Sequence, residues 1–226
     1  MAGFAALGRS QSTISIPVPT SVPSDASQAV DHSFLGFGVE TASWPDYAGN
    51  LTSPNLFSRN LVESLTNKTG KGTIIRVGGT SGDHATYVSS QVEAVIRPPS
   101  QVGLNVPWGI TIGSTYFEGY SNFPGNKYTV MVPMAPVKNG NLTNSIDQTQ
   151  AAIAGMGGLS SLESLELGNE PNAYPGVDRP SDYSPANYST EWLQYTPELI
   201  SALGLPEGPT QQALAIGSDA PAEWNV

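Results

Sequence analysis

The segment with the clearest chemical content is Leu165–Tyr174, which reads Leu-Glu-Leu-Gly-Asn-Glu-Pro-Asn-Ala-Tyr. Its apolar positions favour a buried strand ending at Gly168, because Pro171 has no N–H with which to continue a ladder. Proline also disfavours helical geometry at the residue before it, which predicts an extended Glu170. Barrel enzymes usually keep catalytic carboxylates at the carboxyl ends of parallel strands. Glu170 is therefore a candidate general acid or base, with a water-facing strand-end glutamate as the alternative.

Other polar residues lie near the ends of predicted strands. Asn169 and Tyr174 flank Glu170, and their side chains are suited to hydrogen-bonding a polyhydroxylated ligand. Arg76 lies inside the apolar run 73–79, so it either points outward to water or meets a carboxylate. We favour a position in the mouth of a barrel, where Arg76 orients Glu170 or another acid.

The loop after Arg76 and the end of the first strand supply two further acids. Paired glycines permit a tight loop, in which Asp83 is a candidate ligand contact. Glu40 ends the first predicted strand as Glu170 ends the fourth, and a polar strand cap is the alternative reading. His32 and His84 are the only histidines and lack the spacing of a zinc site. We expect no metal and no cofactor.

Strand-like and helix-like segments alternate along most of the chain. Predicted strands cover 34–40, 73–79, 128–132, 162–168 and 213–217, and predicted helices cover 56–65, 146–156 and 185–203. Such alternation favours parallel strands joined by crossover helices. The sequence therefore predicts an α/β fold, an incomplete (β/α)8 TIM barrel of about five units, with a larger open sheet as the competing architecture. A long excursion at 92–124 contains a predicted hairpin strand at 108–112.

The N-terminal part differs in composition from the rest of the chain. Residues 1–33 are rich in Ser, Thr and Pro, and the alternation of Ile14, Ile16 and Val18 predicts an edge strand followed by a linker. We expect two regions, an N-terminal segment at 1–33 and a barrel domain at 34–226.

Composition limits the partners. The net charge is −10 with only nine Lys and Arg, which argues against nucleic acid, and no run approaches the roughly 20 apolar residues of a membrane span. The absence of cysteine excludes thiol chemistry. Glycosylation sequons favour an extracellular, secreted protein, although the first ten residues do not read as an intact signal peptide. The sequons are at Asn50, Asn67, Asn141 and Asn187.

These motifs resemble glycoside hydrolase family 79, the β-glucuronidase and heparanase family. The Asn-Glu-Pro element is shared by a wider clan of retaining barrel glycosidases, and Arg-Val-Gly-Gly-Thr-Ser-Gly-Asp at 76–83 suggests this family. The match covers about residues 30–226 and implies the N-terminal part of the catalytic barrel. It implies that Glu170 is the general acid/base, that Asn169 hydrogen-bonds near the sugar 2-hydroxyl, and that Asp83 and Glu40 line the sugar subsite. The implied partner is a glucuronide or a uronic-acid-containing glycan.

The resemblance also implies groups that have no counterpart in this sequence. The family's nucleophile is a second glutamate ending the seventh barrel strand, and no position here matches it. Asp219 and Glu223 follow the fifth strand, and we expect neither to replace that nucleophile. A β-sandwich normally accompanies the barrel, so residues 14–23 would be a strand of it. The main hypothesis is a glucuronidase-like chain without turnover. The alternatives are a carbohydrate-binding remnant, another retaining glycosidase of the clan, or a fragment that self-associates through open sheet edges.

Overall fold

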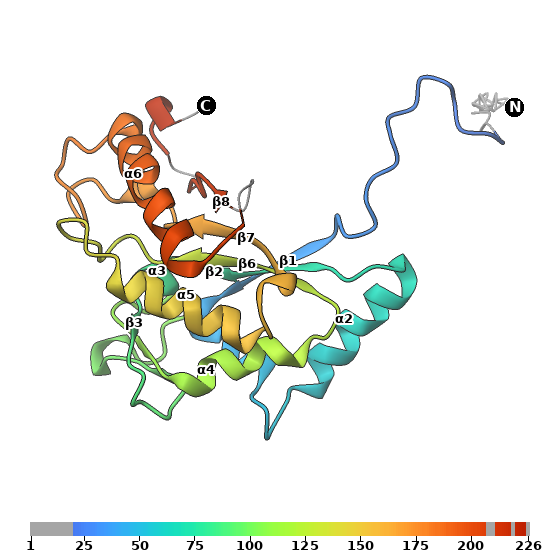
Figure 1. The fold of residues 1–226 in the computed structure, drawn as a ribbon, viewed down its shortest axis with the longest axis horizontal. Coiled ribbons are helices and arrows are strands. Elements are labelled where there is room, and N and C mark those ends of the chain that lie inside the picture. The colour runs from blue at the N-terminus through green and yellow to red at the C-terminus, as the bar shows by residue number, and fades with distance from the viewer. Residues whose placement is uncertain (1–19, 207–210, 218–219, 225–226) are drawn as a thin grey trace, which may run out of the picture. The chain divides into compact units, whose positions relative to one another are not determined.

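The computed structural model describes residues 20–206, 211–217 and 220–224, and Figure 1 follows their course. The chain divides into two units, Met1–Asp31 and His32–Val226. The described part of the first unit, residues 20–31, has turns and bends without helix or strand. The strand predicted around Ile14–Val18 lies outside the described residues. Everything below concerns the second unit.

The second unit is built on a five-stranded sheet whose spatial order follows the chain order. All strand pairs in this sheet are parallel. Successive βα units of a barrel produce this arrangement, which agrees with the class predicted from the sequence. The strands are β1 (Gly36–Glu40), β2 (Ile74–Gly78), β6 (Lys127–Val132), β7 (Leu162–Leu167) and β8 (Gln211–Gln212).

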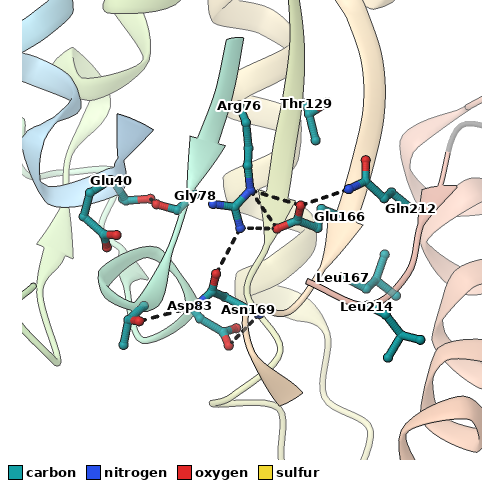
Figure 2. A network of polar contacts seen from close by, with 12 residues as sticks. Glu40, Arg76, Gly78, Asp83, Thr129, Glu166, Leu167, Asn169, Gln212 and Leu214 are labelled. Atoms are coloured by element: carbon teal, nitrogen blue, oxygen red, sulfur yellow. Dashed lines mark hydrogen bonds and ion pairs between the residues drawn. The ribbon is translucent and has the colours of Figure 1, made fainter. Parts of the chain in front are cut away.

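The two faces of the sheet differ in polarity because successive side chains of a strand alternate. One face is apolar and buried, through Ile75, Val77, Tyr128, Val130, Val132, Leu165 and Leu167. The other face carries the polar side chains drawn in Figure 2, including Arg76, Thr129, Glu166 and Gln212. In a barrel this second face is the interior, so the sheet presents a polar interior surface.

Three long helices follow strands as predicted: α2 (Leu56–Thr69), α5 (Thr143–Gly155) and α6 (Pro185–Leu203). Helix α6 begins at a capping box between Ser184 and Asn187 and ends at Gly204, whose φ of 60° is left-handed. The shorter helices are α1 (Trp44–Ala48), α3 (Thr80–Asp83) and α4 (Ser114–Glu118). Short 3₁₀ turns lie at Thr41–Ser43, Pro99–Gln101, Gly119–Asn122, Leu159–Ser161, Pro171–Ala173 (η5) and Ala222–Trp224.

The excursion after β2 forms a second, small sheet. Its strand order is β3 (Thr86–Tyr87), β5 (Thr111–Ile112), β4 (Val95–Ile96), and β4 pairs antiparallel with β5. The predicted hairpin strand at 108–112 is therefore present but shorter. Its last residues, Ile110 and Ile112, are buried in the core.

The fifth strand was predicted too late in the chain. Pairing with β7 is confined to Gln211–Gln212, and residues 213–217 are not a strand. Leu214 has a φ of 62°, which turns the backbone out of a ladder. Among the described residues, no helix is long and apolar enough to cross a membrane.

Candidate active site

Glu170 follows β7 by three residues and has an unusual backbone conformation. Its φ of 51° and ψ of 57° are left-handed, so the prediction of an extended Glu170 is wrong. Pro171 disfavours only the right-handed helical region, and two backbone hydrogen bonds fix the alternative. The Glu170 N–H donates to Ala215 O at 2.7 Å, and the Ala173 N–H donates to Glu170 O at 2.7 Å. Strained non-glycine conformations of this kind cluster at functional sites.

The Glu170 side chain packs against the backbone that follows β8. A Cβ added at Gly217 would lie 3.0 Å from the carboxyl carbon of Glu170, so only glycine fits there without displacement. The Gly217 N–H donates to Asn172 Oδ1 at 2.9 Å, which fixes this approach. Packing on this glycine therefore positions the half-buried carboxyl of Glu170.

Asp83 lies at the end of α3, in the loop after β2, and is held by hydrogen bonds inside the protein. It is fully buried, and its two oxygens accept four hydrogen bonds. Oδ1 accepts from the N–H groups of Met134 at 2.6 Å and Ala135 at 3.1 Å. Oδ2 accepts from the Asn169 N–H at 3.0 Å and the Tyr174 hydroxyl at 2.5 Å. These four hydrogen bonds tie the loops after β6 and β7 together, and the ligand contact expected of Asp83 stays a prediction.

Burial and hydrogen bonding shift the pKa of the Asp83 carboxyl in opposite directions. Burial raises the pKa of its carboxyl above the ordinary value of 3.8, and the donated hydrogen bonds partly lower it again. The pKa of the partner hydroxyl is raised as well: burial and the neighbouring Asp83 charge raise the pKa of Tyr174 well above 10.

Tyr174 is likewise buried and hydrogen-bonded inside the protein. Its side chain is 2% exposed, and its hydroxyl points at Asp83. A Cβ at Gly168 would lie 2.5 Å from that hydroxyl, and the φ of Gly168 is 74°. Glycine at 168 therefore lets the strand end pass over the buried tyrosine. The substrate contact predicted for Tyr174 stays a prediction.

Arg76 pairs with the carboxylate of Glu166 (Figure 2). This is one of the two arrangements expected from the sequence. Its Nε donates to both Glu166 oxygens at 3.1 and 3.0 Å, and its Nη2 pairs with Glu166 Oε1 and donates to Asn169 Oδ1 at 2.9 Å. The Arg76 side chain is 31% exposed and that of Glu166 only 2%. The pair thus orients the Asn169 amide, whose Nδ2 donates to Thr80 Oγ1 at 3.3 Å.

Glu166 was not predicted from the sequence, although a signal was present. A charged residue between Leu165 and Leu167 must point away from the face on which those leucines are buried, and so into the barrel interior. There Gln212 Nε2 donates to Glu166 Oε2 at 3.3 Å, which links β8 to β7 (Figure 2). The polar interior therefore continues across the sheet.

Glu40 ends β1 beside the loop that follows β2. Its Oε1 accepts the Ser81 N–H at 2.7 Å. The carboxylate lies where a Cβ of Gly79 would be, and Gly79 has a φ of 97°. This half-buried acid is held at the carboxyl edge of the sheet, on the same side as Asn169 and Glu170.

We expect Gly79→Ala to displace Glu40. The substitution forces alanine into a backbone region essentially restricted to glycine, which costs roughly 1–3 kcal/mol, and its methyl group overlaps the Glu40 carboxylate. Urea unfolding measures the stability change, and calorimetry with glucuronic acid measures the effect on a sugar ligand. Gly38→Ala is the control, because nothing lies within 4 Å of a Cβ there. Equal stability and affinity for both variants would contradict the placement of Glu40.

The carboxyl edge of the sheet, which corresponds to the mouth of a barrel, has more negative than positive charge. Desolvation lowers the pKa of Arg76, but the hydrogen bond and charge of Glu166 outweigh it, and Glu40 and Glu170 add to the rise. Three carboxyl groups therefore act on one guanidinium. Such a field favours positive charge developing on a ligand, as at the anomeric carbon during glycoside cleavage.

Metal binding and glycosylation concern other residues. The described residues contain no group of three or more His, Cys, Asp or Glu side chains arranged to hold a metal ion. The sequon side chains of Asn50, Asn141 and Asn187 accept local backbone hydrogen bonds, and Asn67 is exposed on α2. Glycosylation and secretion stay predictions.

Together, the parallel βα order and the acid-lined carboxyl edge define part of a (β/α)8 barrel with an acidic site at its mouth. A solved structure supports this class. The crystal structure of a 4-O-α-L-rhamnosyl-β-D-glucuronidase from Fusarium oxysporum, in complex with Rha-GlcA, superposes with a TM-score of 0.67 at 24% identity. The superposition covers 83% of this chain and 39% of that one. The predicted fold class is confirmed.

The chain is homologous to β-glucuronidases over most of its length, so the resemblance seen in its motifs is confirmed. It is 33% identical to a β-glucuronidase of Aspergillus niger over 199 residues, which are 85% of this chain and 36% of that protein. It is 31% identical to a β-glucuronidase of Neurospora crassa, over 84% of this chain and 34% of that protein. The chain thus spans about a third of the length of these relatives. No family model matches it.

Proposed function

We propose that this chain carries the sugar-binding and proton-donating part of a retaining β-glucuronidase site of glycoside hydrolase family 79. Glu170 is the general acid/base, and Asn169 and Glu40 contact the glucuronyl ring. The observation that carries the proposal is the strained, left-handed Glu170, which lies three residues after β7 and whose carboxyl packs on Gly217. Homology to β-glucuronidases supports the choice of substrate.

In the proposed reaction, the protonated Glu170 carboxyl donates its proton to the glycosidic oxygen. The bond between that oxygen and the anomeric carbon breaks, and the leaving group departs as an alcohol. Positive charge then grows on the sugar ring, where the carboxylates of Glu40 and Glu166 stabilise it. A retaining enzyme needs a second carboxylate about 5–5.5 Å from the first to capture the anomeric carbon. We assign that role to no residue of this chain.

Residues beneath the site hold its side chains in position. Arg76 and Glu166 hold the Asn169 amide from the interior, and Asp83 holds the Asn169 backbone. Because both ends of Asn169 are fixed, its orientation toward a sugar hydroxyl is set before a ligand binds, which lowers the entropy cost of binding.

We expect the chain to bind glucuronic acid and a chromogenic β-glucuronide without releasing product. Glu170→Gln keeps a hydrogen-bond donor and should bind as wild type does. Glu170→Ala removes the donor and should lose about three- to tenfold in affinity, the worth of roughly one hydrogen bond. Calorimetry and the release of chromophore are the measurements.

Several outcomes contradict parts of this proposal. Product release that Glu170→Gln abolishes would mean that a second carboxylate operates within the chain. Release that survives Glu170→Gln would exclude Glu170 as the acid. Absence of any binding would remove the glucuronide site altogether. Binding without release is also what a non-catalytic carbohydrate-binding protein would give, and an unchanged affinity in Glu170→Ala would favour that alternative.

A further inference from the structure

One aromatic side chain near the mouth is unexplained by this function. Trp108 lies in the excursion between β4 and β5, and its side chain is 43% exposed. Its neighbours Pro107 and Ile110 are buried, and the backbone N–H of Trp108 donates to Gln101 Oε1 at 3.1 Å. An exposed indole on a backbone anchored at both sides is held in place rather than left to move.

The indole stacks on His84, the residue after Asp83. The two ring centroids are 4.0 Å apart and the planes differ by 17°. His84 is itself fixed, because Nδ1 lies 2.9 Å from Thr80 O and Nε2 lies 3.1 Å from Asp178 Oδ2. Contacts at both ring nitrogens therefore hold the imidazole in one orientation. One face of Trp108 is backed by this fixed ring, and the other face takes no part in the stack.

The stack connects to the sugar site through one residue. Thr80 contacts the His84 ring through its carbonyl, and its hydroxyl accepts from Asn169 Nδ2 at 3.3 Å. Asp178, the other partner of the imidazole, lies in the loop that follows Glu170. The Trp108–His84 stack is thus joined, through Thr80 and Asp178, to the segments that carry Asn169 and Glu170.

We propose that Trp108, backed by His84, is a binding platform for a carbohydrate ring linked to the glucuronyl group. The C–H face of a pyranose packs on an exposed indole, while its hydroxyls stay in water, a division that suits a half-exposed tryptophan. This inference rests on the proposed glucuronyl site and adds a second subsite to it. The linked ring can be joined at C1 or at O4 of the glucuronyl unit, and the experiment separates the two.

The test compares three ligands by calorimetry: glucuronic acid, a disaccharide with glucuronic acid β-linked through C1, and rhamnosyl-glucuronic acid linked through O4. We expect one disaccharide to bind wild type about three- to tenfold more tightly than glucuronic acid does. Trp108→Ala should abolish that gain and leave the affinity for glucuronic acid unchanged. His84→Ala should lose part of it. Phe57→Ala, which removes a 75% exposed aromatic from α2, is the control and should change nothing.

Fluorescence gives an independent readout. Trp44 and Trp224 are buried and Trp192 is half-buried, so Trp108 is the most exposed indole of the four. The disaccharide should change the emission of wild type but not that of Trp108→Phe. If neither disaccharide binds more tightly than glucuronic acid, or if Trp108→Ala keeps the gain, the platform is overturned and the glucuronyl site stands. If glucuronic acid fails to bind but a disaccharide binds through Trp108, the platform stands alone. If no ligand binds, both are overturned.

Discussion

Asp83→Ala is expected to lower the free energy of unfolding by at least about 3 kcal/mol, a large fraction of the stability of a typical domain. The alanine leaves three backbone N–H groups and the Tyr174 hydroxyl without an acceptor in a fully buried place. Each unpaired buried donor costs roughly 1–3 kcal/mol unless water enters. Urea unfolding measures the change, and the melting temperature should fall by about 6 °C or more.

A graded series separates this mechanism from a general loss of packing. Asp83→Asn keeps one accepting oxygen and should cost less than Asp83→Ala, and Tyr174→Phe, which removes one donor, should cost about 1 kcal/mol. Asp182→Asn, on an exposed acid, is the control. Equal costs across the series would contradict the hydrogen-bond account.

The pH dependence of this series follows from the raised pKa of Asp83. A carboxyl whose folded pKa lies above its ordinary value of 3.8 adds stability below pH 3.8, and this contribution is lost as pH rises through the folded pKa. The stability difference between wild type and Asp83→Asn should therefore shrink as pH rises above 3.8. A difference that grows would reverse the assigned direction.

Glu166→Gln should cost about 2–3 kcal/mol and loosen the sugar site at the same time. The substitution removes the charge that Arg76 faces and sets an amide against its N–H groups. The cost stays below that of a fully buried broken pair because Arg76 is 31% exposed and water can solvate it. Released from Glu166, Arg76 no longer fixes Asn169, so the affinity for glucuronic acid should fall as well. Urea unfolding and calorimetry measure the two effects.

A double-mutant cycle isolates this pair. In an Arg76→Met background, Glu166→Gln should cost less than about 1 kcal/mol. Glu163→Gln is a matched control on the same strand, because its partner Lys127 is 53% exposed and such surface pairs contribute about 0–1 kcal/mol. Additive costs of the Arg76 and Glu166 substitutions would show that the two residues do not depend on each other.

The regular elements were predictable from the sequence because their signals are local. Helix α6 has the predicted bounds, Pro185–Leu203, since Ser184, Pro185 and Gly204 mark its ends in the sequence itself. The β strands of the barrel were located by short apolar runs. The last strand was misplaced because Gln211–Gln212 has no apolar signal, and its pairing comes from β7.

The roles of polar residues were less predictable because they depend on distant partners. In the sequence, Asp83 looks like an acid in an exposed loop. It is buried only by loops that lie 50 or more residues away in the chain. Glu166 lies 90 residues from Arg76, so neither could be assigned to the other. Glu170 was located correctly at a strand end, but its left-handed backbone depends on a hydrogen bond to Ala215, which no local rule contains.

The four donors around Asp83 also set how the mouth can open. They come from the loop after β6, from Asn169 after β7 and from Tyr174 after the turn η5, so one carboxyl joins the loop after β6 to the segment that carries Glu170. None of these segments can detach without leaving a buried acid partly unpaired. Local unfolding of the mouth is therefore cooperative: the loop that carries Glu170 is released together with its neighbours, as one unit, or stays closed.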